Sequence, residues 1–141
     1  MRKQRGDDRR AAPPQTVDLQ SVDLAAKLER FEETWAPKIV ADYNGDEIMV
    51  AKFQGAFPFH VHEDTDDLFL VLKGRIRIEL EGPEFPNGRA AHDVEEGQLF
   101  IVPKGVRHRP VAEQEAHVLL IEPAGTPNTG DAATAVQKDR I

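Results

Sequence analysis

The stretch from His60 to Gly74 constrains this chain more than any other part of its sequence. His60 and His62 are two residues apart, and successive side chains of a β-strand point to opposite faces, so both imidazoles should lie on one face. An acidic loop follows, and then an apolar run, 68–72, which ends at a glycine turn and is typical of a buried strand. Imidazole and carboxylate groups are good ligands for divalent first-row metals. The stretch therefore predicts two imidazoles and a neighbouring carboxylate that converge on one ion.

A second segment, 97–108, has the pattern of a turn, a strand, a further turn and a histidine on the next strand. Together the two segments resemble the two motifs of the cupin superfamily. The first motif consists of a glycine, an HxH pair, an acidic residue and a second glycine, which correspond to Gly55, His60, His62, Asp67 and Gly74. The second motif corresponds to Gly97, Pro103, Gly105, His108 and Ala112. The resemblance covers residues 37–123.

Three positions depart from the family pattern. Gly55 is one residue closer to the first histidine than the pattern asks, and Ala112 stands where the family often has asparagine. Asp67 stands where the family usually has glutamate, which shortens the ligand arm by one methylene. Asp66 and Glu63 are alternative carboxylates, although both fit the spacing less well.

The resemblance implies that one divalent transition metal is held inside a barrel by His60, His62, Asp67 and His108. Such a ligand set would leave two positions of an octahedral ion open for water, dioxygen or a bidentate substrate. It suits iron, manganese, zinc, nickel or copper. A lone histidine on a strand is more often an ordinary core or surface residue, but three of the five histidines fall on the pattern. The other two, His92 and His117, are expected to be ordinary strand residues.

Length and composition limit the class of protein. A chain of 141 residues is expected to form one domain. The net charge of −7 counts against sequence-independent binding of nucleic acid, which needs a basic surface. We expect neither a membrane span nor a secretory signal, because no long apolar run is present. The absence of cysteine excludes disulfides and thiolate metal sites and suits a cytoplasmic location.

The chain divides into four segments in order. Residues 1–15 are predicted to be a disordered tail, and 16–36 a helical segment whose helix, 21–35, follows a periodic apolar stripe. Residues 37–123 should form the barrel, and 124–141 a C-terminal arm rich in small and polar residues. The barrel segment contains eight or nine short strands. They include a hairpin at Asn44-Gly45 and another across Lys73-Gly74, as well as separate strands at 107–112 and 116–122.

These elements predict an all-β fold with one N-terminal α-helix, as a closed antiparallel barrel of the cupin type, a jelly roll also called a double-stranded β-helix. If Asp67 points inward, Phe69 and Val71 point inward with it. Leucines 68, 70 and 72 then lie on the opposite face, which a second sheet, the helix or a partner subunit must cover. Members of the resembled family often dimerise in this way, so the resemblance implies a homodimer.

The function is narrowed to a few alternatives. The chain is similar to small stand-alone cupins that are called mannose-6-phosphate isomerase-like. The first hypothesis is a metal-dependent enzyme of the isomerase or oxygenase type, with a small oxygenated or anionic metabolite as its ligand. The second is a non-catalytic protein that binds or senses a small molecule. A third, an interaction protein with an empty barrel, requires that no metal is bound.

Overall fold

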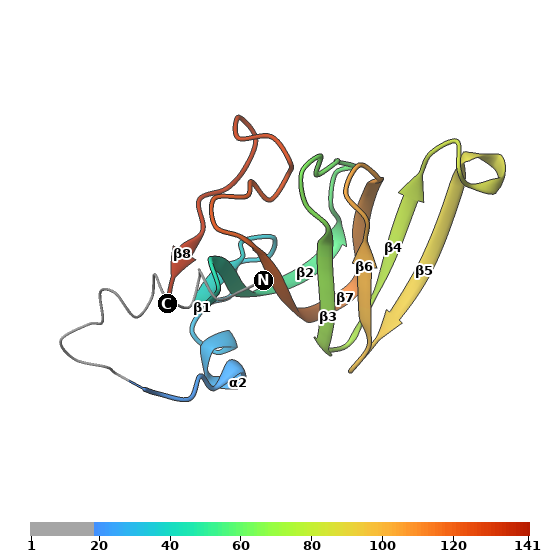
Figure 1. Cartoon of the computed structure of the whole chain (residues 1–141). Helices are drawn as coiled ribbons and strands as arrows, with labels where there is room; N and C mark the ends of the chain where they lie inside the picture. Colours follow the sequence, from blue (N-terminus) through green and yellow to red (C-terminus); the bar gives the residue numbers. More distant parts are fainter. Residues whose placement is uncertain (1–18) are drawn as a thin grey trace.

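The computed structural model describes residues 19–141 and shows an antiparallel β architecture with one short α-helix among them (Figure 1). The predicted tail, 1–15, and the first three residues of the predicted helical segment lie outside the described residues. No described helix has the length and apolar character that a membrane span requires. The elements are α2 (Leu24–Leu28), β1 (Lys38–Tyr43), β2 (Asp46–Ala56), β3 (Asp67–Lys73), β4 (Arg75–Glu81), a 3₁₀ turn (Pro86–Gly88), β5 (Arg89–Glu95), β6 (Leu99–Val102), β7 (Arg107–Pro123) and β8 (Asp139–Arg140).

The 17-residue strand β7 is the centre of the barrel. It pairs with β2 along one edge, and along the other edge with β4 in its first half and with β3 in its second half. β5 extends the sheet beyond β4, and β6 extends it beyond β3. The two strands predicted at 107–112 and 116–122 are therefore one element, whose register with β2 shifts in its middle.

The two predicted hairpins have different outcomes. Asn44 and Gly45 have φ angles of 55° and 84°, as a type I′ turn requires, and they join β1 to β2 as predicted. The hairpin predicted across Lys73-Gly74 is wrong, because β3 and β4 do not pair with each other. Each pairs instead with a different half of β7, and Gly74 lies so close to β7 that an added Cβ would be 3.3 Å from the Glu115 carbonyl oxygen.

The helix predicted over 21–35 is also too long. Asp23 caps its start by accepting a hydrogen bond from the Ala26 amide, but the helix ends at Leu28. Beyond it the chain forms no regular element and is hydrogen-bonded to β2. The buried Lys52 Nζ donates to the Phe31 carbonyl at 2.6 Å, and the Trp35 amide donates to the Lys52 carbonyl at 2.8 Å. The tertiary hydrogen bonds of β2 thus replace the helical ones.

The hydrophobic core fills the space enclosed by the strands. Phe69 and Val71 are buried, as predicted from the inward direction of Asp67, and Leu68, Leu70 and Leu72 are half-buried on the opposite face. The helix α2 covers one end of that outer face. The other inward-facing core side chains include Met49, Ala51, Phe53, Ile76, Ile78, Val94, Val102, Val118 and Leu120.

Candidate metal centre

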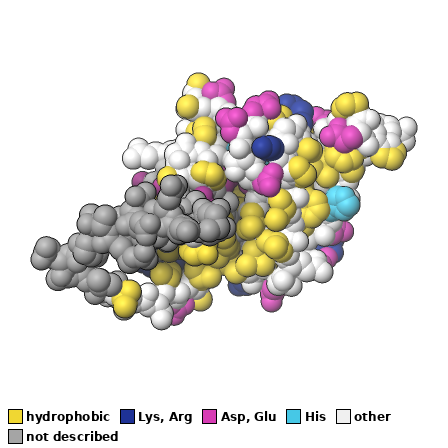
Figure 2. Space-filling model, in the orientation of Figure 1, with side chains coloured by type: hydrophobic (Ala, Val, Ile, Leu, Met, Phe, Trp, Pro, Cys, Tyr) yellow, Lys and Arg dark blue, Asp and Glu magenta, His cyan; other side chains and the backbone are white. Residues whose placement is uncertain are grey.

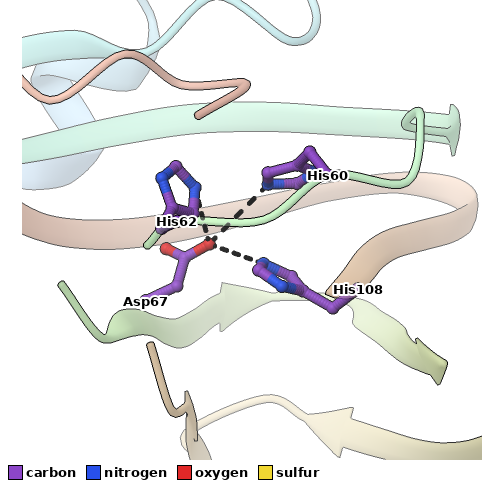
Figure 3. A group of neighbouring side chains, drawn as sticks. All are labelled: His60, His62, Asp67 and His108. Carbon is purple, nitrogen blue, oxygen red and sulfur yellow. Dashed lines mark hydrogen bonds and ion pairs between the residues drawn. The ribbon is translucent and has the colours of Figure 1, made fainter. Parts of the chain in front are cut away.

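Three separate parts of the barrel bring the four predicted ligands to one point (Figure 3). His60 and His62 lie in the connection between β2 and β3, Asp67 begins β3, and His108 is the second residue of β7. The segment of His60 and His62 is not the regular strand that was predicted. It makes a single bridge, in which the His60 and His108 amides donate to each other's carbonyls at 2.9 and 3.0 Å.

The donor atoms of these side chains face a common centre. Oδ2 of Asp67 is 2.8 Å from Nε2 of His108, 3.4 Å from Nε2 of His62 and 4.0 Å from Nε2 of His60. One donor atom from each of the four buried side chains lies within 4.8 Å of the others. The alternative carboxylates lie outside this group, because Glu63 and Asp66 are exposed and Asp66 accepts a hydrogen bond from the Lys104 amide.

Backbone carbonyls fix the orientation of two of the rings. Nδ1 of His60 is 2.9 Å from the Pro58 carbonyl, and Nδ1 of His108 is 2.9 Å from the Val106 carbonyl. A carbonyl oxygen only accepts, so each Nδ1 carries a proton. Nε2 of a neutral His60 ring therefore presents its lone pair to the centre, and Nε2 of His108 lies at hydrogen-bond distance, 2.8 Å, from Oδ2 of Asp67. Ligand histidines in metalloproteins are held in this way.

The third imidazole indicates that the centre is built for a cation. Nε2 of His62 is fully buried and has no hydrogen-bond partner. It lies 3.4 Å from Oδ2 of Asp67, a distance that allows electrostatic attraction but does not make a well-formed hydrogen bond. A buried polar atom without a partner is rare in folded proteins and costs free energy. A metal ion at the centre would satisfy it.

The protonation states suit the same interpretation. Burial lowers the pKa of His60 from 6.5 to about 4, so this ring is neutral at neutral pH. Burial alone would raise the pKa of Asp67, but its hydrogen bond with His108 and its closeness to His62 outweigh burial and hold that pKa well below its usual range. For His62, burial lowers the pKa and the neighbouring Asp67 carboxylate raises it by more. The centre therefore combines an ionised carboxylate with imidazole nitrogens, a donor set that divalent transition metals accept.

A small cavity adjoins the centre, and sequence reasoning missed its other polar groups. Glu122 lines it near Asp67, and its side chain is only 5% exposed. Burial and the charge of Asp67 raise the pKa of Glu122 to about 7, although the Lys138 ammonium lies 3.3 Å away. The sequence did contain a signal for Glu122. It follows Val118 and Leu120 at every second position of β7, so it lies on the same inward face. Nothing in the sequence pattern pointed to Lys138.

Comparisons with known proteins agree with this fold. The model of the Cupin_2 family, whose description is cupin domain, matches residues 47–122. The uncharacterized protein YdbB of Bacillus subtilis (strain 168) is 29% identical over 87 residues, which cover 62% of this chain and 72% of that protein. The structure of a cupin-2 domain containing protein from Shewanella frigidimarina NCIMB 400 superposes with a TM-score of 0.65 at 29% identity, over 72% of this chain and 93% of that one.

A more distant neighbour, the hydroquinone 1,2-dioxygenase from Sphingomonas sp. TTNP3, has a TM-score of 0.66 at 20% identity. The match covers 77% of this chain and 33% of that one, and at this identity it shows the fold alone. The predicted all-β cupin barrel is confirmed by these neighbours. Since the family model matches more than half of the sequence, the chain belongs to the cupin family.

Proposed function

We propose that this protein is a metal-dependent enzyme of the isomerase or oxygenase type that acts on a small oxygenated molecule. One divalent transition metal is held by His60, His62, Asp67 and His108. The observation that carries the proposal is the group of four buried donor atoms within 4.8 Å of one another, which includes a His62 nitrogen without a hydrogen-bond partner.

The chain's own residues provide the surroundings for such chemistry. When bound, a divalent metal would supply Lewis acidity to a carbonyl or hydroxyl oxygen of the substrate. The cavity beside the centre has aromatic walls, where Trp35 stacks on Phe53 at a centroid distance of 4.4 Å and Phe57 stands edge-on to His60 at 5.2 Å. These rings exclude bulk water and lower the local dielectric constant, which strengthens electrostatic interactions at the centre.

A second candidate function is a non-catalytic protein that binds or senses a small molecule, in which the metal would serve as the attachment point of the ligand. The cavity volume of about 40 Å³ is small. At about 10–15 Å³ for each water, it has room for roughly three water molecules. Both candidates share the metal and differ in whether a substrate is turned over. The likeness to the mannose-6-phosphate isomerase-like cupins and the cytoplasmic location stay predictions.

Metal analysis of protein purified without a histidine tag tests the proposal. We expect near-stoichiometric metal in the wild type and its loss in the double variant His60→Ala/His108→Ala. The matched control His92→Ala/His117→Ala removes two histidines outside the group and should keep the metal. Iron or manganese would direct the search for turnover to oxygen uptake and isomerisation, and zinc or nickel to isomerisation and binding. A wild type that contains no metal and takes none up on titration would overturn the proposal.

We also propose that the protein is a homodimer, with the outer face of β3 and β6 as its interface. Neighbouring pairs Leu68–Ile101 and Leu70–Leu99 continue onto β7 at Ile121 and Leu119, so the face is apolar over three strands. Hydrophobic side chains gather in the middle of the side seen in Figure 2. Leu99 and Ile101 are 56% and 46% exposed, which is unusual for such a contiguous set.

Analytical ultracentrifugation tests the dimer. The variant Ile101→Lys should sediment as a monomer, because it places an ammonium group in the centre of an apolar interface. Tyr43→Lys is the control, since Tyr43 is a similarly exposed aromatic residue on the β1–β2 hairpin. A monomeric wild type would refute the interface.

A further inference from the structure

The cavity beside the metal centre is also lined by a second group of polar side chains, which are not candidate metal ligands. This group is called the second polar pole of the cavity. The cavity walls are largely apolar and include the aromatic side chains of Trp35, Phe53, Phe57 and Phe69. Two of the candidate metal ligands, His60 and Asp67, also line the cavity. The remaining polar groups are Glu122, Lys138 and Asn128, and none of them belongs to the group of candidate metal ligands.

Glu122 and Lys138 form a buried ion pair at this pole. Nζ of Lys138 is 3.3 Å from Oε2 of Glu122, and the two side chains are 9% and 5% exposed. The same ammonium group donates to the Thr126 carbonyl oxygen. Burying two charges costs several kcal/mol for each ion, which mutual attraction often fails to recover, and an apolar pair of similar size would often stabilise the barrel as well or better. The stability of the barrel therefore does not explain why a charged pair is buried here, whereas recognition of a ligand does.

Lys138 reaches the cavity from outside the barrel. The chain leaves β7 at Pro123, runs as an irregular arm and returns to pair β8 with β1 (Figure 1). Halfway along, Gly130 lies directly on the segment of the histidines, because a Cβ at that position would overlap the Val61 carbonyl oxygen. The arm is fastened beyond Lys138 by Arg140, which donates to both carboxylate oxygens of Asp42 at 3.0 and 3.1 Å.

The arm forms one side of this cavity through Asn128 and Lys138, and the cavity is partly open to solvent. With a volume of about 40 Å³, the cavity is too small for a substrate of more than a few atoms. Barrel strands are fixed by their ladders of hydrogen bonds, but the arm between β7 and β8 belongs to no ladder. The arm is therefore the part of the wall whose movement would enlarge the cavity and bring Lys138 against a ligand.

We propose that Glu122 and Lys138 are the substrate-recognition pair of this site, and that they select a hydroxyl group on a neutral molecule with an apolar body. A hydroxyl group can accept a hydrogen bond from the ammonium group and donate one to the carboxylate at the same time. A phosphate or carboxylate at this pole would face both Asp67 and Glu122, with one lysine to offset them. The aromatic walls suit the apolar body, and an oxygen at its other end would reach the metal. This inference rests on the proposed metal-dependent function.

Isothermal titration calorimetry of the metal-loaded protein with three matched phenols tests the inference. The probes carry a hydroxymethyl, carboxylate or phosphate group opposite the phenolic oxygen: 4-hydroxybenzyl alcohol, 4-hydroxybenzoate and 4-hydroxyphenyl phosphate. We expect the alcohol to bind at least about tenfold more tightly than either anion, which is the usual size of a discrimination based on charged hydrogen bonds. Equal affinities, tighter binding of an anion, or no binding of any probe would overturn the inference.

Variants identify the residues responsible. Lys138→Met should weaken binding of the alcohol about tenfold or more and change binding of plain phenol little, because phenol has no second hydroxyl group. Lys138→Gln keeps a hydrogen-bond donor, so its affinity for the alcohol should fall less. This variant replaces Lys138→Met in the test if the methionine variant folds poorly. The control is Lys73→Met, at the exposed end of β3 remote from Asp67. Equal effects of Lys138→Met and Lys73→Met would refute the role of the pair.

Metal content is measured on every sample, which separates this inference from the proposed function. A wild type without metal contradicts the proposed function and the inference together. A fully metal-loaded wild type whose preference among the three probes does not depend on Lys138 contradicts the inference alone.

Discussion

His60 should make the metal-free protein sensitive to acid. Burial lowers its pKa in the folded protein from 6.5 to about 4. Between these values the unfolded chain binds a proton at this residue and the folded protein does not, so the free energy of unfolding falls as the pH drops through the window. One pKa unit corresponds to about 1.36 kcal/mol, so the full effect of His60 at pH 4 is roughly 3 kcal/mol. Above pH 6.5 the effect vanishes.

Urea denaturation in the presence of EDTA measures this effect. Trp35, the only tryptophan, lies against Phe53 in the cavity wall, and its fluorescence reports unfolding. The variant His60→Asn has no titrating group, and its amide can still donate to the Pro58 carbonyl. We expect the wild type to lose about 3 kcal/mol more than His60→Asn between pH 7 and pH 4.

Two features of this experiment isolate His60. The raised pKa of His62 acts in the opposite direction, since it stabilises the folded protein at low pH, but it is present in both proteins and cancels in the comparison. His92→Asn, at an exposed position of β5, should keep the full pH dependence of the wild type. If the wild type and His60→Asn lose stability in parallel between pH 6.5 and pH 4, the imidazole of His60 is not held neutral by burial and the argument fails.

Three further predictions concern the stability of the barrel and are checked by the same urea titrations at pH 7. Ile78→Ala removes a fully buried side chain and should cost about 2–5 kcal/mol, whereas a loss below 1 kcal/mol would mean that the site collapses around the cavity. Lys52→Met leaves the Phe31 carbonyl without its charged donor and should cost about 1–3 kcal/mol, with the exposed Lys73→Met close to neutral as its control. Gly45→Ala should cost about 1–2 kcal/mol from its φ of 84° alone, because no atom lies within 4 Å of the added methyl group; a neutral result would show that the turn adopts another conformation.

The convergence of the four candidate ligands was predicted from the resemblance of two sequence segments to the cupin motifs, and local spacing alone placed only His60 and His62 on one face. The approach of His108 to this pair is made by the single bridge between His60 and His108, a long-range contact that local spacing does not specify. Glu122 was predictable in principle, since even-numbered residues of β7 point inward from Ala116 onward and Glu122 continues that series. Lys138 was not, because its position depends on the contacts of the arm with Val61 and on the pairing of β8 with β1.

The wrong predictions have a common physical cause. The helix over 21–35 and the hairpin at Lys73-Gly74 were inferred from local patterns that the sequence does contain. In the structure, long-range hydrogen bonds override both patterns: Lys52 on β2 captures the Phe31 carbonyl, and β7 offers separate edges to β3 and β4. Local propensity decides an element only where no tertiary partner competes for the same backbone groups.

The shape of β7 is what allows one strand to supply both ends of the proposed site. His108 and Glu122 are fourteen residues apart, and a straight strand would separate them by about 45 Å at 3.3 Å for each residue. Both nevertheless lie near Asp67, His108 through a contact of 2.8 Å and Glu122 across the same cavity. The strand must therefore turn back in its middle, where 113–115 are exposed and the register with β2 shifts. A substitution that straightens this bend should disturb the metal centre and the recognition pair together, although it touches neither.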